Sequence, residues 1–368
     1  MKKTIIILIA ILCASSTVKL SAKPTKDSYY VWIAALDAGI YAAKFEPLQG
    51  TFTDVKQVEG QRNGYFIAKH PKLNVIYLAE RSHASSSIHS YQILSNGELK
   101  HVASLDGLPA GIVHISIDNQ GRHIAAAYYK SSYVGVYTLS GNGLQVQVLA
   151  QHQHAGKSIH QRQKEPHPHW SGFSPNGAYV YFADLGTDHI WVYKINQMNR
   201  LVDLVQKAQA PAGSGPRHVS FNQKFELAYV SDELSARVSI YTVNENTGKL
   251  NYLSSTDTRP ELNKEMWFNV SDIKLHPNGN FLYLVNRGFD QVSVFAVQPT
   301  SGLLTFVEHE PIRGSVSRHI NFDHAGEWAF VLGKESNTLA LFKIEQLSGK
   351  LVFSKPIYNI PTPMALVY

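Results

Sequence analysis

Short apolar runs alternate with polar residues along most of the chain, at a period that favours β-strands. In Phe173 to Ile195, a Ser-Pro-Asn-Gly turn precedes two runs rich in Tyr, Val and Ile, and a loop separates these runs. Such a pattern predicts strand, tight turn, strand, loop and strand. Equivalent stretches run over Ile117 to Leu139, Phe221 to Val243, Leu275 to Val297 and Phe322 to Ile344. No long stretch has the apolar period of a helix, so we expect an all-β protein.

A short turn, often Gly-x-Leu, recurs seven times after these runs. Its Gly or Asn residue is Gly50, Gly97, Gly143, Asn199, Gly248, Gly302 and Gly349, at intervals of 47, 46, 56, 49, 54 and 47 residues. A period of this size is typical of β-propeller blades. The sequence therefore predicts a seven-bladed β-propeller with four antiparallel strands in each blade.

The last eight residues, Pro361 to Tyr368, are too few to form a further blade. We expect them to supply the innermost strand of the blade that begins with Tyr29 to Phe52. This arrangement closes the ring, so that no sheet edge stays open.

Polar residues recur where the innermost strand of each blade begins. In each blade we take the residues that lie four and three positions before the apolar residue preceding the tight turn. Compared from blade to blade, these two positions form two columns of residues. Because side chains alternate along a strand, we expect the two columns to face opposite sides, so that one of them lines the central channel. The first column contains His169, Arg217, Ser271 and Arg318, and the second contains His114, Trp170, His218, Asp272 and His319.

The loop after the second strand of each blade is expected on the same rim as these strand starts. The two longest intervals carry their additional residues in Gln151 to Trp170 and Ser254 to Asp272, which again reach this rim. Additional loop length at one rim favours a shaped pocket. The equivalent loop position is charged in five of six blades: Arg81, Lys130, Leu185, Glu233, Arg287 and Lys334.

Any one of these polar residues could simply satisfy backbone groups at a strand end, and that interpretation stays open for each residue alone. The combination of His169, Arg217, Glu233 and Arg287 on one rim favours a functional site instead.

A histidine-rich run could suggest a metal site, because imidazole is a common metal ligand. The run lacks Cys or carboxylate residues at a matching spacing, so we expect no metal and no other cofactor. For His152 and His154 a solvated loop is the favoured interpretation. The run consists of His152, His154, His160, His167 and His169.

The first residues have the features of a secretory signal peptide. A basic start at Met1 to Lys3 precedes an uncharged apolar run from Thr4 to Leu12, which is too short to span a bilayer. Small residues favour cleavage after Ala22 and also allow cleavage after Ser16. We therefore expect residues 1–22 to be a leader and residues 23–368 to be a single propeller domain. The mature protein is then periplasmic or secreted, with no membrane attachment and no cysteine, because Cys13 lies in the leader.

The composition excludes several protein classes. With 368 residues, 44% of them hydrophobic, and one cysteine, the chain is not disordered, collagen-like or a disulfide-stapled mini-protein. Its formal net charge is +6, but loss of the leader lowers Lys+Arg from 34 to 31 against 28 acids and leaves +3. This charge is too small to favour nucleic acid as a partner. We expect a monomer that binds a small molecule.

Five short stretches match one known family: Arg162 to His169, Ala183 to Asp188, Gly215 to His218, Asp232 to Leu234, and Val285 to Gly288. They resemble the lactonase family of seven-bladed propellers, which includes bacterial 6-phosphogluconolactonase and fungal carboxy-cis,cis-muconate cyclase. The resemblance covers about Tyr29 to Tyr368. It implies that His169, Arg217, Glu233 and Arg287 are the catalytic residues, since the equivalent family residues form the proposed active site.

The chain also departs from the family pattern. Asp232 stands where the family usually has Asn, the turn Phe221 to Lys224 lacks the usual Pro-x-Gly, and the first blade is divergent. A secretory leader is not expected of an enzyme that acts on a cytoplasmic sugar phosphate. The resemblance therefore implies the fold and a lactonase-type hydrolase, but it does not fix the substrate.

Lactone hydrolysis needs an activated water, a donor to the oxyanion and a cationic clamp for an anionic substrate. Glu233 or His169 would take the proton of the water. Arg217 and Arg287 would polarise the carbonyl and hold an anionic group. The substrate would be a small anionic lactone or sugar acid, and the residues expected to bind it are His167, His218, Asp272, Arg318, His319 and His114.

Two other functions stay open. The same residues could run a cycloisomerase reaction, in which an acid and a base move a proton beside a carboxylate and no water is consumed. The protein could also be a non-catalytic secreted propeller that binds a sugar acid, a peptide or a protein at its rim, because the fold alone does not decide the function. The intact spacing of the four residues favours the enzyme.

Overall fold

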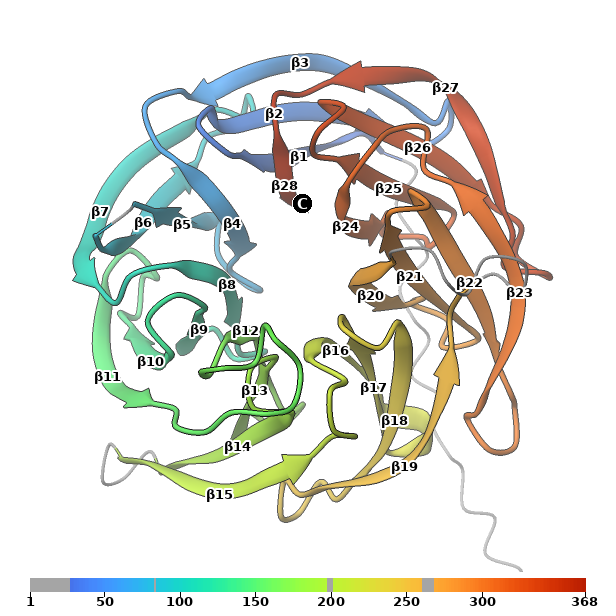
Figure 1. The fold of residues 1–368 in the computed structure, drawn as a ribbon. Helices are drawn as coiled ribbons and strands as arrows, with labels where there is room; N and C mark the ends of the chain where they lie inside the picture. Colours follow the sequence, from blue (N-terminus) through green and yellow to red (C-terminus); the bar gives the residue numbers. More distant parts are fainter. Residues whose placement is uncertain (1–26, 83, 197–200, 260–267) are drawn as a thin grey trace, which may run out of the picture.

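The described residues form one ring of seven four-stranded antiparallel sheets (Figure 1). The structure is a computed structural model, and it describes residues 27–82, 84–196, 201–259 and 268–368. The predicted seven-bladed β-propeller is thereby confirmed. The predicted leader, residues 1–22, lies outside the described residues.

The blades follow one another in chain order, and within each blade the strands run outward from the ring axis in the order in which they are named. Blade 1 contains β28 (Pro363–Val367), β1 (Tyr29–Ala35), β2 (Gly39–Glu46) and β3 (Thr51–Glu59). Blade 2 contains β4 (Gly64–Lys69), β5 (Val75–Arg81), β6 (Ser86–Ile93) and β7 (Leu99–Leu108). Blade 3 contains β8 (Ile112–Ile117), β9 (His123–Tyr128), β10 (Tyr133–Leu139) and β11 (Val146–Gln153).

The remaining four blades repeat this order. Blade 4 contains β12 (Pro168–Phe173), β13 (Tyr179–Asp184), β14 (His189–Asn196) and β15 (Leu201–Gln209). Blade 5 contains β16 (Pro216–Asn222), β17 (Leu227–Asp232), β18 (Arg237–Val243) and β19 (Leu250–Asp257), with the short helix η1 (Gln223–Phe225) between β16 and β17. Blade 6 contains β20 (Asn269–Leu275), β21 (Phe281–Arg287), β22 (Gln291–Val297) and β23 (Leu304–Pro311). Blade 7 contains β24 (Ser317–Phe322), β25 (Trp328–Gly333), β26 (Thr338–Ile344) and β27 (Leu351–Asn359).

The two ends of the chain close the ring in blade 1. The C-terminal strand β28 pairs antiparallel with β1, with Ile33 opposite Leu366 and Ala34 opposite Ala365. The prediction that the C-terminal residues supply the innermost strand of the first blade is therefore confirmed. No helix in the described ranges is long and apolar enough to cross a membrane.

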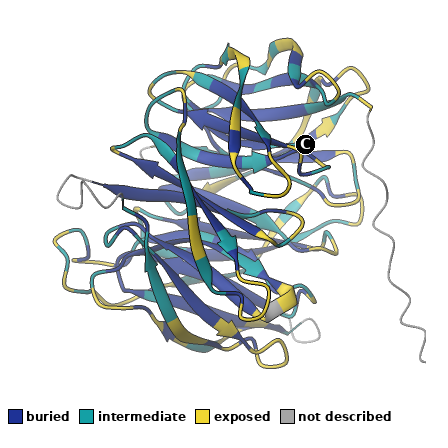
Figure 2. Cartoon of the chain, turned by 90° about the vertical axis from the view of Figure 1, so that its right-hand side faces the viewer, coloured by how far each residue is buried: buried dark blue, intermediate teal, exposed yellow. Residues whose placement is uncertain are grey.

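Apolar side chains pack between neighbouring blades, as between blades 6 and 7 and between blades 7 and 1. Figure 2 shows that exposure is concentrated on the outer strands and loops. The second strands are almost fully buried, as in β13 and β17. The outermost strands consist mostly of exposed and partly buried residues, as in β7 and β11. A strand buried on both faces carries a nearly continuous apolar run, which explains the Tyr-rich and Val-rich runs of the sequence.

Six of the seven recurring turns lie within the described residues, and each of these lies against the neighbouring blade. The Tyr283 hydroxyl of blade 6 donates to the carbonyl of Gly349 in blade 7, at 2.6 Å, and Tyr229 donates to Gly302 in the same way. Bonds of this kind, from a Tyr hydroxyl or a Trp ring N–H, join six of the seven blade interfaces. The turn at the seventh interface lies outside the described residues.

Steric constraints explain why glycine occupies these turns. Gly349 has φ of +75°, and a Cβ atom built on it would lie 2.3 Å from the ring of Phe281. Glycine tolerates the left-handed conformation, and its lack of a side chain lets the neighbouring ring approach.

Candidate active site

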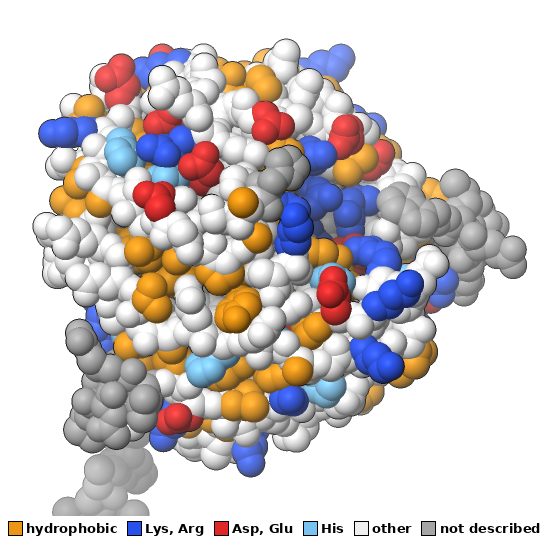
Figure 3. Space-filling view, turned by 60° about the vertical axis from the view of Figure 1, so that its left-hand side comes forward, with side chains coloured by type: hydrophobic (Ala, Val, Ile, Leu, Met, Phe, Trp, Pro, Cys, Tyr) orange, Lys and Arg blue, Asp and Glu red, His pale blue; other side chains and the backbone are white. Residues whose placement is uncertain are grey.

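Four arginines line one cavity of about 220 Å³ on the face where the innermost strands begin. We call it the arginine cavity. Figure 3 shows Lys and Arg side chains gathered around a hollow on this face. The lining contains one carboxylate and one imidazole beside the four guanidinium groups. The complete lining is Tyr65, Arg81, Val113, Tyr129, Arg162, His169, Glu233, Arg287 and Arg318.

Glu233 follows β17 directly and binds three arginines from three different parts of the chain. Its Oε1 lies 2.7 Å from Nη1 of Arg162. Its Oε2 lies 2.8 Å from Nε of Arg217 and 3.0 Å from Nη2 of Arg287. Glu233, Arg217 and Arg287 are all buried. Both carboxylate oxygens are therefore engaged with guanidinium groups.

These ion pairs determine the ionisation of the cluster. Burial alone would raise the pKa of Glu233, but the charges of Arg287, Arg217 and Arg162 outweigh it and lower the pKa to about 2. Burial lowers the pKa of Arg217 to about 10, helped by the charges of Arg287 and Arg318 and opposed by Glu233. At neutral pH the carboxylate is ionised and the guanidinium groups are charged, so the cavity attracts anions.

His169 is the imidazole of the arginine cavity, and it is almost completely buried. Burial, and then the charges of Arg217 and neighbouring cationic or imidazole groups, lower its pKa well below the ordinary value of 6.5. Its Nδ1 atom is buried without a hydrogen-bond partner among the described residues. His169 is therefore neutral at neutral pH and can accept a proton.

Arg162 reaches Glu233 from the long loop between β11 and β12, which blade 4 anchors. The next residue, Gln163, donates through its side chain to Oδ1 of Asp188 at 2.6 Å. Asp188 is fully buried and also accepts from the backbone N–H groups of Gly213 and Gly215, at 2.6 and 2.7 Å. One carboxylate thus fixes both the loop that carries Arg162 and the segment that leads into Arg217.

Tyr65 connects the remaining two arginines of the cavity. The guanidinium of Arg81 lies over its ring, 5.1 Å from the centroid, and Nη1 of Arg318 donates to its hydroxyl at 3.3 Å. A second hollow of about 470 Å³ shares Tyr65 and Arg81 with the arginine cavity. It gives room beside the cavity for the distal part of a substrate.

The predicted site residues fall into three groups. His169, Glu233, Arg287 and Arg318 line the arginine cavity, and Arg217 contacts it through its ion pair with Glu233. His167 does not line the cavity, because its ring stacks on Tyr129 at 4.3 Å and supports that residue from behind. The other four predicted binding residues lie in a different cavity: His114, His218, Asp272 and His319.

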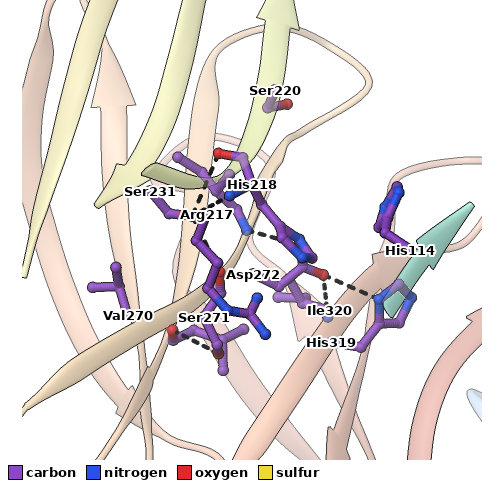
Figure 4. A network of polar contacts seen from close by, with 12 residues as sticks. His114, Arg217, His218, Ser220, Ser231, Val270, Ser271, Asp272, His319 and Ile320 are labelled. Atoms are coloured by element: carbon purple, nitrogen blue, oxygen red, sulfur yellow. Dashed lines mark hydrogen bonds and ion pairs between the residues drawn. The ribbon is translucent and has the colours of Figure 1, made fainter. Parts of the chain in front are cut away.

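These four residues form a buried cluster one layer further along the ring axis (Figure 4). Asp272 is bound by Nδ1 of His218 at 2.8 Å and by Nδ1 of His319 at 3.1 Å. The ring of His114 lies 5.3 Å from that of His218, which in turn lies 5.4 Å from the ring of His169. They are neighbours of the arginine cavity but not part of its lining.

The expectation that only one polar column lines the channel is wrong. Residues of both columns, such as His169 and His218, line cavities within the ring. Near the start of β12 and of β16, the pairing with the next strand skips one residue. These residues are His169 and Arg217, which have no direct partner on the next strand. Equivalent register shifts occur in β4, β8 and β24. Such a β-bulge interrupts the alternation of side chains, so neighbouring residues can point to the same side.

The interpretation of His154 as part of a solvated loop is also wrong. His154 is buried, its Nδ1 lies 2.7 Å from Oδ2 of Asp184, and its ring stacks on Trp191 at 3.8 Å. It directly follows β11 of blade 3 and packs against blade 4 as a structural residue. Within the described residues, no group of three or more His, Cys, Asp or Glu side chains is placed to hold a metal ion.

Sequence reasoning did not place Tyr65, Tyr129 or Arg162 in the site. Arg162 had one signal, since it lies in the longer of the two rim loops. Tyr65 occupies the bulge position of β4 that corresponds to His169 in β12, so its place in the repeat could have identified it.

Known proteins match this chain along most of its length. A family model described as "Lactonase, 7-bladed beta-propeller" matches residues 30–368. A 6-phosphogluconolactonase of Bacillus subtilis is 29% identical over 335 residues, covering 90% of this chain and 94% of that protein. A 6-phosphogluconolactonase of Formosa agariphila is 30% identical over 323 residues, covering 85% of this chain and 90% of that protein.

Solved structures give the same picture of the fold. The periplasmic gluconolactonase of Pseudomonas aeruginosa has a TM-score of 0.86 and 25% identity, over 93% of this chain and 99% of that chain. A putative 6-phosphogluconolactonase of Bacteroides uniformis has a TM-score of 0.85 and 23% identity, over 93% of this chain and 99% of that chain.

Proposed function

The chain belongs to the lactonase family of seven-bladed β-propellers, and from this premise we propose that it hydrolyses a sugar-acid lactone in the arginine cavity. The observation that carries the proposal is the neutral, buried His169 beside Glu233 and its bound arginines in one cavity. A proton acceptor and fixed positive charges are the two requirements for attack of water on an ester carbonyl.

His169 takes the proton of the attacking water. Its imidazole is neutral because burial and neighbouring arginines lower its pKa. The oxyanion that develops on the lactone carbonyl offsets part of that positive charge, so it shifts the pKa of His169 upward while the proton is transferred. Glu233 is the weaker candidate, since its pKa of about 2 and its three ion pairs leave it little affinity for a proton.

The arginines stabilise the charge that develops during the reaction. The water oxygen bonds to the carbonyl carbon, the carbonyl oxygen becomes an oxyanion, and a guanidinium of Arg287 or Arg318 donates to it. The ring C–O bond then breaks, and the proton held by His169 passes to the leaving ring oxygen. The product is an open-chain hydroxy acid, which ionises at neutral pH.

Glu233 acts as the positioning residue of the cluster. Its three ion pairs hold Arg162, Arg217 and Arg287 in one arrangement before substrate binds. Such preorganised donors cost little rearrangement during the reaction, and loss of one typically lowers kcat by about 100- to 1,000-fold.

We further propose that the substrate is an unphosphorylated aldonolactone outside the cytoplasm. The basic start and apolar run of residues 1–22 support export. The periplasmic gluconolactonase of Pseudomonas aeruginosa, 25% identical to this chain, is a precedent for that location and substrate class. A tagged full-length chain should be recovered from the envelope fraction about 2 kDa shorter than its precursor, by rough residue arithmetic.

The test is a pH-stat assay of the purified protein with D-glucono-1,5-lactone and with its 6-phosphate. We expect acid release with the unphosphorylated lactone above the spontaneous rate, and the hydroxy acid as the product. A preference for the phosphorylated lactone would overturn the substrate assignment. Formation of an isomer without uptake of water would favour a cycloisomerase, and binding without turnover across a panel of aldonolactones would favour a binding protein.

A further inference from the structure

A second cavity of about 360 Å³ lies within the ring next to the arginine cavity. We call it the lysine cavity, after Lys69 and Lys274 in its lining. The two cavities share no lining residue. Its volume falls in the range of about 300 to 1,000 Å³ that is usual for small-molecule sites.

The two cavities are stacked along the ring axis. Four innermost strands each contribute one residue to the arginine cavity and the next residue to the lysine cavity: Tyr65 and Phe66, Val113 and His114, His169 and Trp170, and Arg318 and His319. The lysine cavity therefore lies further along these strands than the arginine cavity.

The positive charge of the lysine cavity comes from two ammonium groups. In the part of the chain that the structure describes, no acidic oxygen lies within 4.0 Å of the ammonium of Lys69 or Lys274. The one carboxylate of the lining, Asp272, is already engaged by His218, His319 and the backbone N–H groups of Ile273 and Ile320. Burial lowers the pKa of Lys69, so an anion beside it would restore the stability of the charged form.

Two histidines of the lining present opposite hydrogen-bonding groups. Nδ1 of His218 faces Oδ1 of Asp272 at 2.8 Å, so this nitrogen carries the proton and Nε2 is an acceptor. Nδ1 of His114 accepts from the backbone N–H of Ser171 at 3.3 Å and lies 3.2 Å from the Ser171 hydroxyl oxygen, and on the backbone contact we assign the His114 proton to Nε2. The two rings are 5.3 Å apart, and no described residue bonds to either Nε2. A donor beside an acceptor suits a hydroxyl group, which can both accept and donate.

Aromatic side chains form the apolar part of the lining. Phe66 and Trp170 flank His114, at ring distances of 4.2 and 5.7 Å, and Phe221 lies 6.3 Å from Trp170. Such walls can cover the carbon skeleton of a small ligand while the polar groups fix its orientation.

We propose that the lysine cavity binds a small hydroxycarboxylate anion, with its carboxylate between Lys69 and Lys274 and a hydroxyl between His114 and His218. This is the chemical class of the hydroxy acid that lactone hydrolysis releases. The proposal is nevertheless independent of the proposed function, because it concerns binding alone and requires no turnover.

The test is titration of the full chain with sodium gluconate, followed by calorimetry and by tryptophan fluorescence. Because Trp170 lines the lysine cavity, gluconate should quench its emission, and Trp170→Phe should remove the quenching but keep the heat of binding. We expect Lys69→Met and Lys274→Met each to weaken binding at least 10-fold. Sodium acetate, which lacks hydroxyl groups, should bind at least 10-fold more weakly than gluconate.

The exposed lysines Lys194 and Lys350 provide matched controls. Their replacement by Met should leave gluconate binding unchanged, and thermal unfolding should show that all variants are folded. Binding that survives Lys69→Met and Lys274→Met, without quenching of Trp170, would place gluconate in the arginine cavity and overturn the proposal. Absence of binding, or equal binding of acetate, would also overturn it.

Discussion

Replacement of Asp232 by Asn should change the free energy of unfolding, relative to wild type, more favourably at pH 8 than at pH 5. Asp232 is fully buried, and burial raises its pKa from 3.8 to about 7, with a further contribution from the charge of Asp188. One of its oxygens accepts from the Ser239 hydroxyl at 2.5 Å, and Oδ1 has no partner among the described residues. The wild-type protein must therefore bury an uncompensated charge at pH 8.

The sign follows from the number of protons that each state binds. Between the two pKa values the folded state holds a proton that the unfolded state has released, so the free energy of unfolding falls as the pH rises. For pKa values of 3.8 and about 7, Asp232 alone accounts for a loss of about 2.5 kcal/mol between pH 5 and pH 8. Asn does not titrate and avoids this loss.

Urea denaturation of wild type and Asp232→Asn at pH 5 and pH 8 measures this effect. Any constant difference between the two side chains, such as an unpaired amide N–H, cancels when the two pH values are compared. Asp106→Asn, at an exposed position, is the control and should show no such difference. A stability difference between variant and wild type that is the same at both pH values would refute the reasoning.

Further predictions concern Glu233 with its bound arginines, His169 as the base, and the turn glycines at the blade interfaces. Glu233→Gln leaves buried arginines without their carboxylate and should cost about 3 to 5 kcal/mol in the free energy of unfolding, measured in urea. Glu98→Gln, at an exposed position, is its control and should leave stability nearly unchanged. Because the pKa of His169 lies well below 6.5, kcat/KM should not fall as the pH is lowered through 6.5. A midpoint near pH 6.5 in that profile would contradict the neutral, buried imidazole. Gly349→Ala should lower the unfolding free energy by about 1 kcal/mol or more, because φ is +75° and Phe281 fills the space of the new methyl group. Gly141→Ala, which meets nothing within 4 Å, should change stability much less.

The blades could be predicted from the sequence because each one repeats the same local chemistry. A turn glycine such as Gly349 must adopt positive φ and accept the neighbouring ring, so it recurs at a fixed period. The second strands between these turns, such as β13 and β17, are buried on both faces, which makes their runs nearly continuously apolar. Both features are encoded within about 50 consecutive residues, the period of a blade.

The site was only partly predictable, since two of its determinants are not local. The bulge that turns His169 and His218 toward neighbouring cavities depends on how two strands pair, and an alternating pattern does not reveal it. The position of Arg162 depends on Gln163 bonding to Asp188, a residue 25 positions away. The sequence also left Glu233 and His169 as equal candidates for the base. Burial and the three ion pairs of Glu233 distinguish their pKa values, and both arise only in the folded structure.

The most direct test of the proposed hydrolysis is the rate of acid release by His169→Gln, measured in the pH-stat with saturating D-glucono-1,5-lactone. His101→Gln, at an exposed position, is the matched control. Loss of a general base typically lowers the rate by about 100- to 10,000-fold. We therefore expect a fall of at least about 100-fold in kcat for His169→Gln, with unchanged thermal stability and wild-type activity of the control. A folded His169→Gln variant with wild-type turnover would contradict the assignment of His169 as the base.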